Sequence, residues 1–414
     1  MLGTLLDKLG TLLPKNFIIA NFFPTLLFAT VNGLLLFWVS IRFRHVVNGY
    51  FKLSAAQQAL IGVPVLIAIT LASYILSTLN LLQREVLEGQ HLTKGARNKL
   101  KAGQQRRIRA WEKKSREIMD RTRRLDLLRG VARLADARDA GKKLTTECTY
   151  SESTEAAKKV EALDKKRQRY ELITPEELDE ATKSLVEELE KCPVDKETHF
   201  NDINRKRVLD RDHETLRDCI KFAQEEALNE YVVIYNEREF NYSRYRLAPT
   251  AMGNIAESIR SYASSRYEMN LDPFWSRLQK VLSVDDKFYS SLVDAKTQLD
   301  FMISLFWLTV CLTAAWSVAL VYLRRSILAF LLVAIVGPVL SVLWYKIALQ
   351  NYRAFADILR SSIDLYRFDL LDSLHVRWPD GTDQERRTWG TLNQIIGYGQ
   401  PGEKISYHHP EQRP

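Results

Sequence analysis

The sequence predicts an all-α membrane protein in which two transmembrane helical hairpins flank a helical cytoplasmic domain. Three features predict it: long apolar runs without charge, their grouping in two close pairs, and a highly charged stretch between the pairs. A run that crosses the hydrocarbon layer needs about 20 apolar residues, and only a helix satisfies its backbone hydrogen bonds within one segment. The uncharged runs lie between Lys15 and Arg42, Lys52 and Arg84, Asp300 and Arg324, and Arg325 and Lys346.

The first part of the chain, residues 1–15, has the pattern of an amphipathic helix lying in the membrane interface. Its leucines recur at helical spacing, whereas Asp7 and Lys8 fall on the other side. An alternative is that these residues begin the first transmembrane helix. The next apolar run is too long for the core of a signal peptide, and no Ala-x-Ala site follows it. We therefore expect no cleavable signal peptide.

The apolar runs define the spans of the two hairpins. The first hairpin, 16–83, holds spans at about 17–40 and 56–80, and the second, 300–346, holds spans at about 301–323 and 327–345. No Asp, Glu, Lys, Arg or His lies deep in any of them. Because pumps and many ion-coupled carriers use buried ionisable groups, this composition disfavours those classes.

Small polar residues nevertheless line one face of each span in the first hairpin. Asn21 and Asn32 share a face of the first span, and Ser73, Ser77 and Asn80 share a face of the second. Such residues let helices pack closely and hydrogen-bond to one another. They are also candidate pore-lining residues, and the sequence leaves packing and pore lining both open.

Positive charge predicts the orientation of the hairpins. The loops inside the hairpins hold five Lys or Arg, whereas the flanks on the side of the central domain hold nine close to the spans. Cytoplasmic flanks carry the excess of Lys and Arg in membrane proteins. Both termini and the central domain, 84–299, are therefore expected in the cytoplasm.

Charge in the central part of the chain falls into two blocks of opposite sign. Residues 84–145 hold 19 Lys or Arg against 8 Asp or Glu, a net +11, and residues 146–300 hold 24 against 32, a net −8. In the basic block, apolar residues recur every three or four positions over 104–139, which predicts a basic helix. Its cations could pair with the acidic block, contact anionic lipid headgroups, or bind nucleic acid or another acidic partner. The candidate lipid- or partner-binding residues are Arg106, Arg107, Arg109, Lys113 and Lys114.

Further helices are predicted after the basic helix. Thr174, Pro175 and Glu177 have the types and spacing of a capped helix start, and this helix should end near Lys191. Another helix is expected at about 205–239. In the C-terminal region, 347–414, a helix over 350–374 continues the fourth span.

No motif for catalysis or cofactor binding occurs in the sequence. It has no GxxxxGK[ST] or GxGxxG phosphate loop, no GxSxG nucleophile turn and no HExxH metal helix. The four cysteines are widely spaced, and Cys311 lies within a span, so we expect reduced thiols and neither a disulfide framework nor a zinc site. We therefore expect no enzyme activity, no cofactor and no metal.

The segment before the third span is the most distinctive part of the chain. It combines Pro, Gly and Asn, which indicate a turn or a close backbone approach, with Arg and aromatic residues. We predict that it forms a gating elbow made of Pro249, Gly253, Asn254, Arg266, Tyr267 and Trp275.

The same segment is also similar to a segment found in other membrane proteins. The segment resembles that of a group of bacterial four-span membrane proteins with P-T-x-x-G-N, then R-Y-G, then a W-P-R-L-like sequence ahead of the third span. Glu268 here replaces the Gly, and Ser276 stands where the group often has Pro. The resemblance implies the four-span architecture and a bacterial inner membrane, and it transfers no activity.

Two classes of function fit these observations. Four spans make a small bundle, and a water-filled path is usually built by several subunits, so we expect a homo-oligomer. The first class is a bacterial inner-membrane channel or membrane-permeabilising effector, for example in phage defence. A protein or small-molecule trigger would gate it through the cytoplasmic domain by moving the elbow and the third span. The second is a non-conducting scaffold that binds protein partners or anionic lipid.

Overall fold

The computed structural model describes residues 14–140, 154–191, 200–243, 245–322, 327–399 and 407 of the chain. All regular elements among these residues are helices, and a single bridge pair, Val376 with Tyr407, is their only β-type pairing. This confirms the all-α prediction. The predicted interfacial helix over 1–15 lies almost entirely outside the described residues, as do Arg324 and Arg325.

The chain divides into two compact units. One is formed by the chain up to Gln104 together with the chain from Glu239 onward, and the other is Gln105–Arg238. The division differs from the predicted domain 84–299, because both ends of that range belong to the same unit as the apolar helices. Helices α6 (Lys94–Ala140) and α9 (Phe200–Asn241) connect the units.

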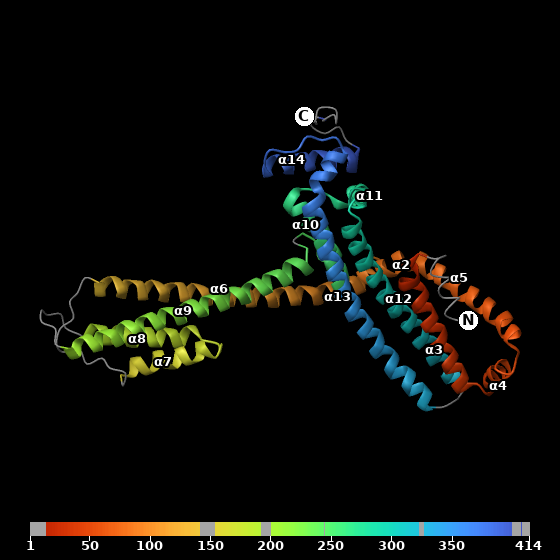
Figure 1. The fold of residues 1–414 in the computed structure, drawn as a ribbon, viewed down its shortest axis with the longest axis horizontal. Helices are drawn as coiled ribbons and strands as arrows, with labels where there is room; N and C mark the ends of the chain where they lie inside the picture. Colours follow the sequence, from red (N-terminus) through yellow and green to blue (C-terminus); the bar gives the residue numbers. More distant parts are fainter. Residues whose placement is uncertain are drawn as a thin grey trace. The chain divides into compact units, whose positions relative to one another are not determined.

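Within the described residues, four helical segments are long and apolar enough to cross a membrane. They are Lys15–Val39, which comprises α2, a π-helical turn η1 and α3, and the helices α5 (Ala55–Glu88), α12 (Asp286–Tyr322) and α13 (Ile327–Ser373). These segments contain the four predicted spans, as expected of a multi-pass membrane protein. Helices α12 and α13 run side by side along much of their length (Figure 1).

The helix ends follow from local sequence. Ser54 and Gln57 form a reciprocal capping box at the start of α5. The π-helical turn Ile18–Phe22 ends two residues before Pro24, whose ring nitrogen cannot donate to the carbonyl of Ala20. The Phe23 N–H bonds instead to the carbonyl of Ile18. Between the first two spans, where we expected a loop, residues Ile41–Tyr50 form helix α4, which Ser40 caps.

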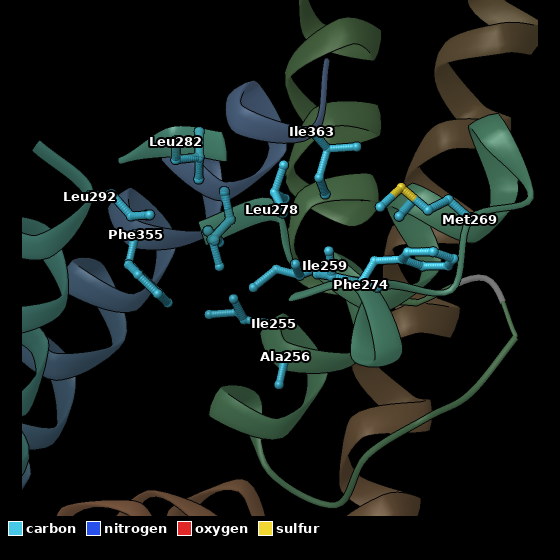
Figure 2. Packing of buried hydrophobic residues seen from close by; sticks show 14 of the residues in the cluster. Ile255, Ala256, Ile259, Met269, Phe274, Leu278, Leu282, Leu292, Phe355 and Ile363 are labelled. Atoms are coloured by element: carbon cyan, nitrogen blue, oxygen red, sulfur yellow. The ribbon is translucent and has the colours of Figure 1, made fainter. Parts of the chain in front are cut away.

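Outside the apolar segments, the first unit contains a second set of packed helices. These are α10 (Ala251–Tyr267), α11 (Leu271–Leu282), the first turns of α12, the second half of α13, and α14 (Thr382–Leu392). Figure 2 shows Ile255, Ile259 and Leu278 pointing into one shared interior. In α11 the buried residues Leu271, Phe274, Leu278 and Leu282 follow the three-four spacing of an amphipathic helix. Trp389 of α14 closes the core, with its ring 5.4 Å from that of Phe274.

The second unit is a bundle made of α6 from Gln105 onward, α7 (Glu155–Gln168), α8 (Pro175–Lys191) and most of α9. Its core includes Leu125, Leu178 and Leu216, which are at most 1% exposed. The predicted capped start of α8 is confirmed. The Glu177 N–H donates to Thr174 Oγ1 at 3.3 Å, and the Thr174 N–H donates to Glu177 Oε2 at 3.1 Å.

Candidate functional site

The C-terminal end of α5 meets the N-terminal end of α10 in the closest backbone approach around any described glycine. A β-carbon on Gly253 would lie 2.2 Å from the carbonyl oxygen of Glu88, so only glycine fits at this position. Gly89 ends α5 in the left-handed conformation, at φ +85°, and a β-carbon there would lie 2.4 Å from the Pro249 ring. We call this contact of Glu88, Gly89, Pro249, Gly253 and Asn254 the α5–α10 junction.

Polar side chains fix the start of α10 at this junction. The Gly253 N–H donates to Thr250 Oγ1 at 3.0 Å, which caps the helix. Buried Asn254 accepts from the Ala248 N–H at 2.8 Å and donates to the Thr250 carbonyl at 2.8 Å. Of the two alternatives for this segment, a turn or a close backbone approach, the structure shows the close approach at Gly253. Gly253 and Asn254 lie in the first turn of a helix and not in a free turn. A gating role for these residues stays a prediction.

The carboxylate of Glu88 connects the junction to α13. The side chain is 7% exposed and accepts from the Tyr352 hydroxyl at 2.7 Å and from Gln90 Nε2 at 2.9 Å. Burial, together with the adjacent Glu88 charge, raises the pKa of Tyr352 well above its usual value. The tyrosine therefore stays protonated and donates to the carboxylate. The C-terminal end of α5, the N-terminal end of α10 and the middle of α13 thus meet at Glu88.

Two further elbow residues, Arg266 and Tyr267, lie at the other end of α10. Tyr262 and Tyr267 both donate to the carboxylate of Asp364 on α13, each at 2.7 Å. Burial and this bond raise the pKa of Tyr267 to about 12. Arg266 lies over the Tyr262 ring at 4.4 Å. Four of the six predicted elbow residues, Gly253, Asn254, Arg266 and Tyr267, thus lie on one 17-residue helix, α10, which has separate contacts at its two ends.

The second elbow aromatic, Trp275, lies on α11. Its half-buried ring packs against the core shared by α10, α11 and α13. We expected the elbow to act on the third span. The main partners of α10 are instead α13 and α5, which contain the fourth and second spans.

A buried arginine fastens the middle of α10 to α13 and to the last turn of α9. Arg360 is 4% exposed and donates to the Phe240 carbonyl at 2.7 Å and to Ser258 Oγ at 2.8 Å. Its only carboxylate partner at ion-pair distance among the described residues is Asp357, at 2.7 Å. Burial lowers the pKa of the Arg360 guanidinium. Sequence reasoning missed this residue, although an Arg at the apolar spacing of its helix is a detectable signal.

A polar pocket of about 420 Å³ opens beside the junction. Its floor includes Gly89, Pro249 and Gly253, so the close backbone approach shapes it. Its charged and amide side chains are Glu88, Gln90, Arg97, Lys101, Arg246, Glu257, Arg260 and Asp272. We call it the junction pocket. None of these residues was predicted as a site residue, because they come from four segments that only the fold brings together.

Within the apolar helices, three of the predicted polar residues, Asn21, Asn32 and Asn80, take part in interhelical hydrogen bonds. Asn80 Nδ2 donates to Asn21 Oδ1 at 3.0 Å, and Trp316 Nε1 donates to Asn32 Oδ1 at 2.9 Å. Ser73 is fully buried and donates to the carbonyl of Ile69, and Ser77 is half-buried. These bonds match the packing alternative within one chain, and pore lining remains a prediction.

Three polar atoms of these helices are buried without a hydrogen-bond partner in the described protein. They are Asn80 Oδ1, Gln83 Oε1 and Ser304 Oγ. Asn80 and Gln83 lie one turn apart on α5, and Ser304 lies one turn before Trp307 on α12. Trp307 Nε1 donates to the Gln83 carbonyl at 3.3 Å, so the two faces are turned toward one another.

A second pocket lies among the apolar helices. It has a volume of about 210 Å³ and is lined by α3, α12 and α13, mostly by Leu and Val side chains. Such a lining favours lipid or helix packing over water. It offers no hydrated path through a single chain.

The candidate lipid- or partner-binding residues of α6 divide into two groups. Lys114 pairs with Glu230 of α9 at 3.0 Å, and Lys113 lies 3.8 Å from Glu117. Arg106, Arg107 and Arg109 are exposed and have no ion-pair partner among the described residues. Internal pairing thus accounts for part of the basic helix, and lipid or partner contact remains a prediction for these three arginines.

No protein-family model, no curated protein and no solved structure matches the chain. In the described part of the chain, no group of three His, Cys, Asp or Glu side chains could hold a metal ion. The features that bear on function are therefore the junction, its pocket and the polar residues of the apolar helices.

Proposed function

We propose that the protein is an oligomeric channel or membrane-permeabilising effector of a bacterial inner membrane, controlled at the α5–α10 junction. Both termini and the central helical region would lie in the cytoplasm, where a protein or a small molecule could act as the trigger. The polar cluster formed by Asn80, Gln83 and Ser304 supports the proposal, because it gives the apolar helices groups that can contact water or a permeating ion.

The observation that carries the proposal is the set of unpartnered atoms on Asn80, Gln83 and Ser304. A buried polar atom without a partner costs about 1–3 kcal/mol in a protein, and more in hydrocarbon, where no water is available. A hydrated path past these atoms would remove the cost. The π-helical turn at Ile18–Phe22 holds Asn21 beside Asn80, and such turns are frequent at functional sites.

The junction is suited to controlling such a path. Its backbone contact leaves no room between Glu88 and Gly253, so this end of α5 cannot move toward α10 unless α10 moves as well. The Glu88–Tyr352 bond extends the coupling to α13. A trigger that moves α10 would therefore displace the end of α5 and the middle of α13 together. Packed contacts of this kind switch between discrete arrangements and do not deform continuously.

Ion flux across liposome membranes tests the proposal. Purified protein should release a trapped ion, and Asn80→Leu should change the flux several-fold because it removes the amide from the polar cluster. Thr78→Val is the matched control: Thr78 is exposed on the same helix and bonds only to the Ile75 carbonyl. Equal effects of the two variants, or a wild-type protein that is a clean monomer in detergent and conducts nothing, would contradict the proposal.

The second candidate is a non-conducting scaffold anchored by the four spans. The Asn21–Asn80 and Asn32–Trp316 bonds favour it, because they use the amides for packing within one chain. A scaffold predicts no flux from wild-type protein and retained binding of anionic vesicles through Arg106, Arg107 and Arg109. Vesicle binding unchanged after neutralising these three arginines would reject the lipid contact.

A further inference from the structure

The junction pocket holds more positive charge than its own carboxylates balance. Arg97 and Lys101 lie one helical turn apart on α6, so their side chains share one face. Arg97 donates to the carbonyl oxygen of Gln90 at 2.7 Å, which is a neutral partner. Lys101 has no hydrogen bond or ion pair among the described residues. Both are half-buried cations without a carboxylate partner.

The other charges of the pocket are already paired. Arg260 lies 3.4 Å from both Glu257 and Asp272, and Arg246 lies 3.7 Å from Glu257. The carboxylate of Glu88 is occupied by Tyr352 and Gln90, at 2.7 and 2.9 Å. The uncompensated charge of the pocket therefore lies on the α6 side.

We infer that the junction pocket binds a phosphate group through Arg97 and Lys101. This goes beyond the proposed channel activity and does not depend on it. A guanidinium and an ammonium that face the same cavity match an anion with two charges, since Arg binds two phosphate oxygens in a planar fork and Lys adds a compact charge. Glu257 and Asp272 already pair with Arg260. The α6 wall of the pocket, with Arg97 and Lys101, is therefore the part that can bind an anion.

The size of the pocket fits a phosphate that carries an organic group. Its volume of about 420 Å³ lies in the range of small-molecule sites, roughly 300–1,000 Å³. The phosphate can belong to a soluble phosphate ester or to a lipid headgroup, because α5 is an apolar, membrane-type helix that ends at Glu88 on the pocket wall. The recognising chemistry is the same for both sources.

Calorimetric titration of the full-length protein in detergent tests the site, with inorganic pyrophosphate as the soluble probe. The lipid arm uses nanodiscs of phosphatidylcholine with and without phosphatidic acid, and measures the thermal midpoint of unfolding. The double variant Arg97→Gln with Lys101→Gln should weaken binding at least tenfold in the arm that responds, since each lost bond to a charged group is worth about a factor of ten. A response to pyrophosphate identifies a soluble ligand, and a response confined to phosphatidic acid identifies a headgroup.

The matched control is Lys94→Gln with Lys99→Gln. It removes the same charge from exposed positions of α6 that do not line the pocket. It should leave binding within about twofold, whereas a loss equal to that of the pocket variant would overturn the proposal in favour of general electrostatic attraction.

Glu257→Gln supplies a test of opposite sign. It removes a carboxylate that faces Arg246 and Arg260, so phosphate binding should become several-fold tighter. Weaker binding by this variant would overturn the charge argument. Absence of binding by wild-type protein in both arms would overturn the proposal itself. Far-UV circular dichroism of each variant confirms that the helices are intact.

Discussion

The substitution Gly253→Ala tests the packing of the α5–α10 junction directly. The added β-carbon would lie 2.2 Å from the carbonyl oxygen of Glu88 and 2.9 Å from the β-carbon of Ala248. Ordinary contacts begin near 3.4 Å, so α5 and α10 would have to separate by roughly 1 Å at this end. Overpacking of a closely packed interior costs about 1–3 kcal/mol. Both neighbours are backbone or a short side chain, so neither can rotate away.

Gly103→Ala is the control, because no atom lies within 4 Å of its β-carbon position. Gly103 is an exposed residue inside α6, where replacement of Gly by Ala gains about 1 kcal/mol of helix propensity. Thermal unfolding in detergent, followed by circular dichroism, should therefore show a lower midpoint for Gly253→Ala and an unchanged or higher midpoint for Gly103→Ala. Equal midpoints for the two variants would refute the steric argument.

Three further predictions concern other parts of the fold. Tyr352→Phe removes the donor to buried Glu88 and should destabilise the protein by about 1–3 kcal/mol. Tyr366→Phe, whose partner Asp285 is exposed, should change stability by less than half as much. Equal losses of stability in the two variants would contradict the role of Glu88. Burial raises the pKa of the Cys219 thiol to about 11. In a variant that retains only this cysteine, iodoacetamide should therefore not react at pH 8 until the protein unfolds, and the stability that the neutral thiol contributes should be lost as pH rises through that pKa. Rapid alkylation of the folded protein would contradict this prediction. Thr174→Ala removes the cap of α8 and should cost about 1 kcal/mol, compared with Ser276→Ala at an exposed position of α11, which should stay within about 0.5 kcal/mol.

Sequence reasoning predicted the elements whose signal is local. The uncharged apolar runs specify the four membrane-type helices, because hydrocarbon excludes other backbone conformations. The start of α8 was predicted from three residues, since Thr174, Pro175 and Glu177 each act within one turn. The segment with Gly253 was predicted to form a turn or a close backbone approach, and the close approach is what Gly253 makes.

The missed features depend on contacts between distant residues. Glu88 and Tyr352 are 264 positions apart, and nothing near either of them in the sequence indicates the other. Helix α14 was missed because the Trp378–Gly381 segment predicts a turn and the helix after it buries little more than Trp389 and Leu392. The start of α6 at Lys94 was also missed, because Gly95, Gly103 and adjacent polar residues give no apolar periodicity there. The junction pocket combines such segments, so no local pattern could predict it.

Single-channel recording in planar bilayers is the most direct test of the central claim, that the α5–α10 junction controls conduction. Wild-type protein should give discrete currents, Gly253→Ala should change the fraction of time that the channel is open, and Gly103→Ala should match the wild type. Currents from Gly253→Ala that match those of the wild type, or no current from any of the three proteins, would contradict the claim.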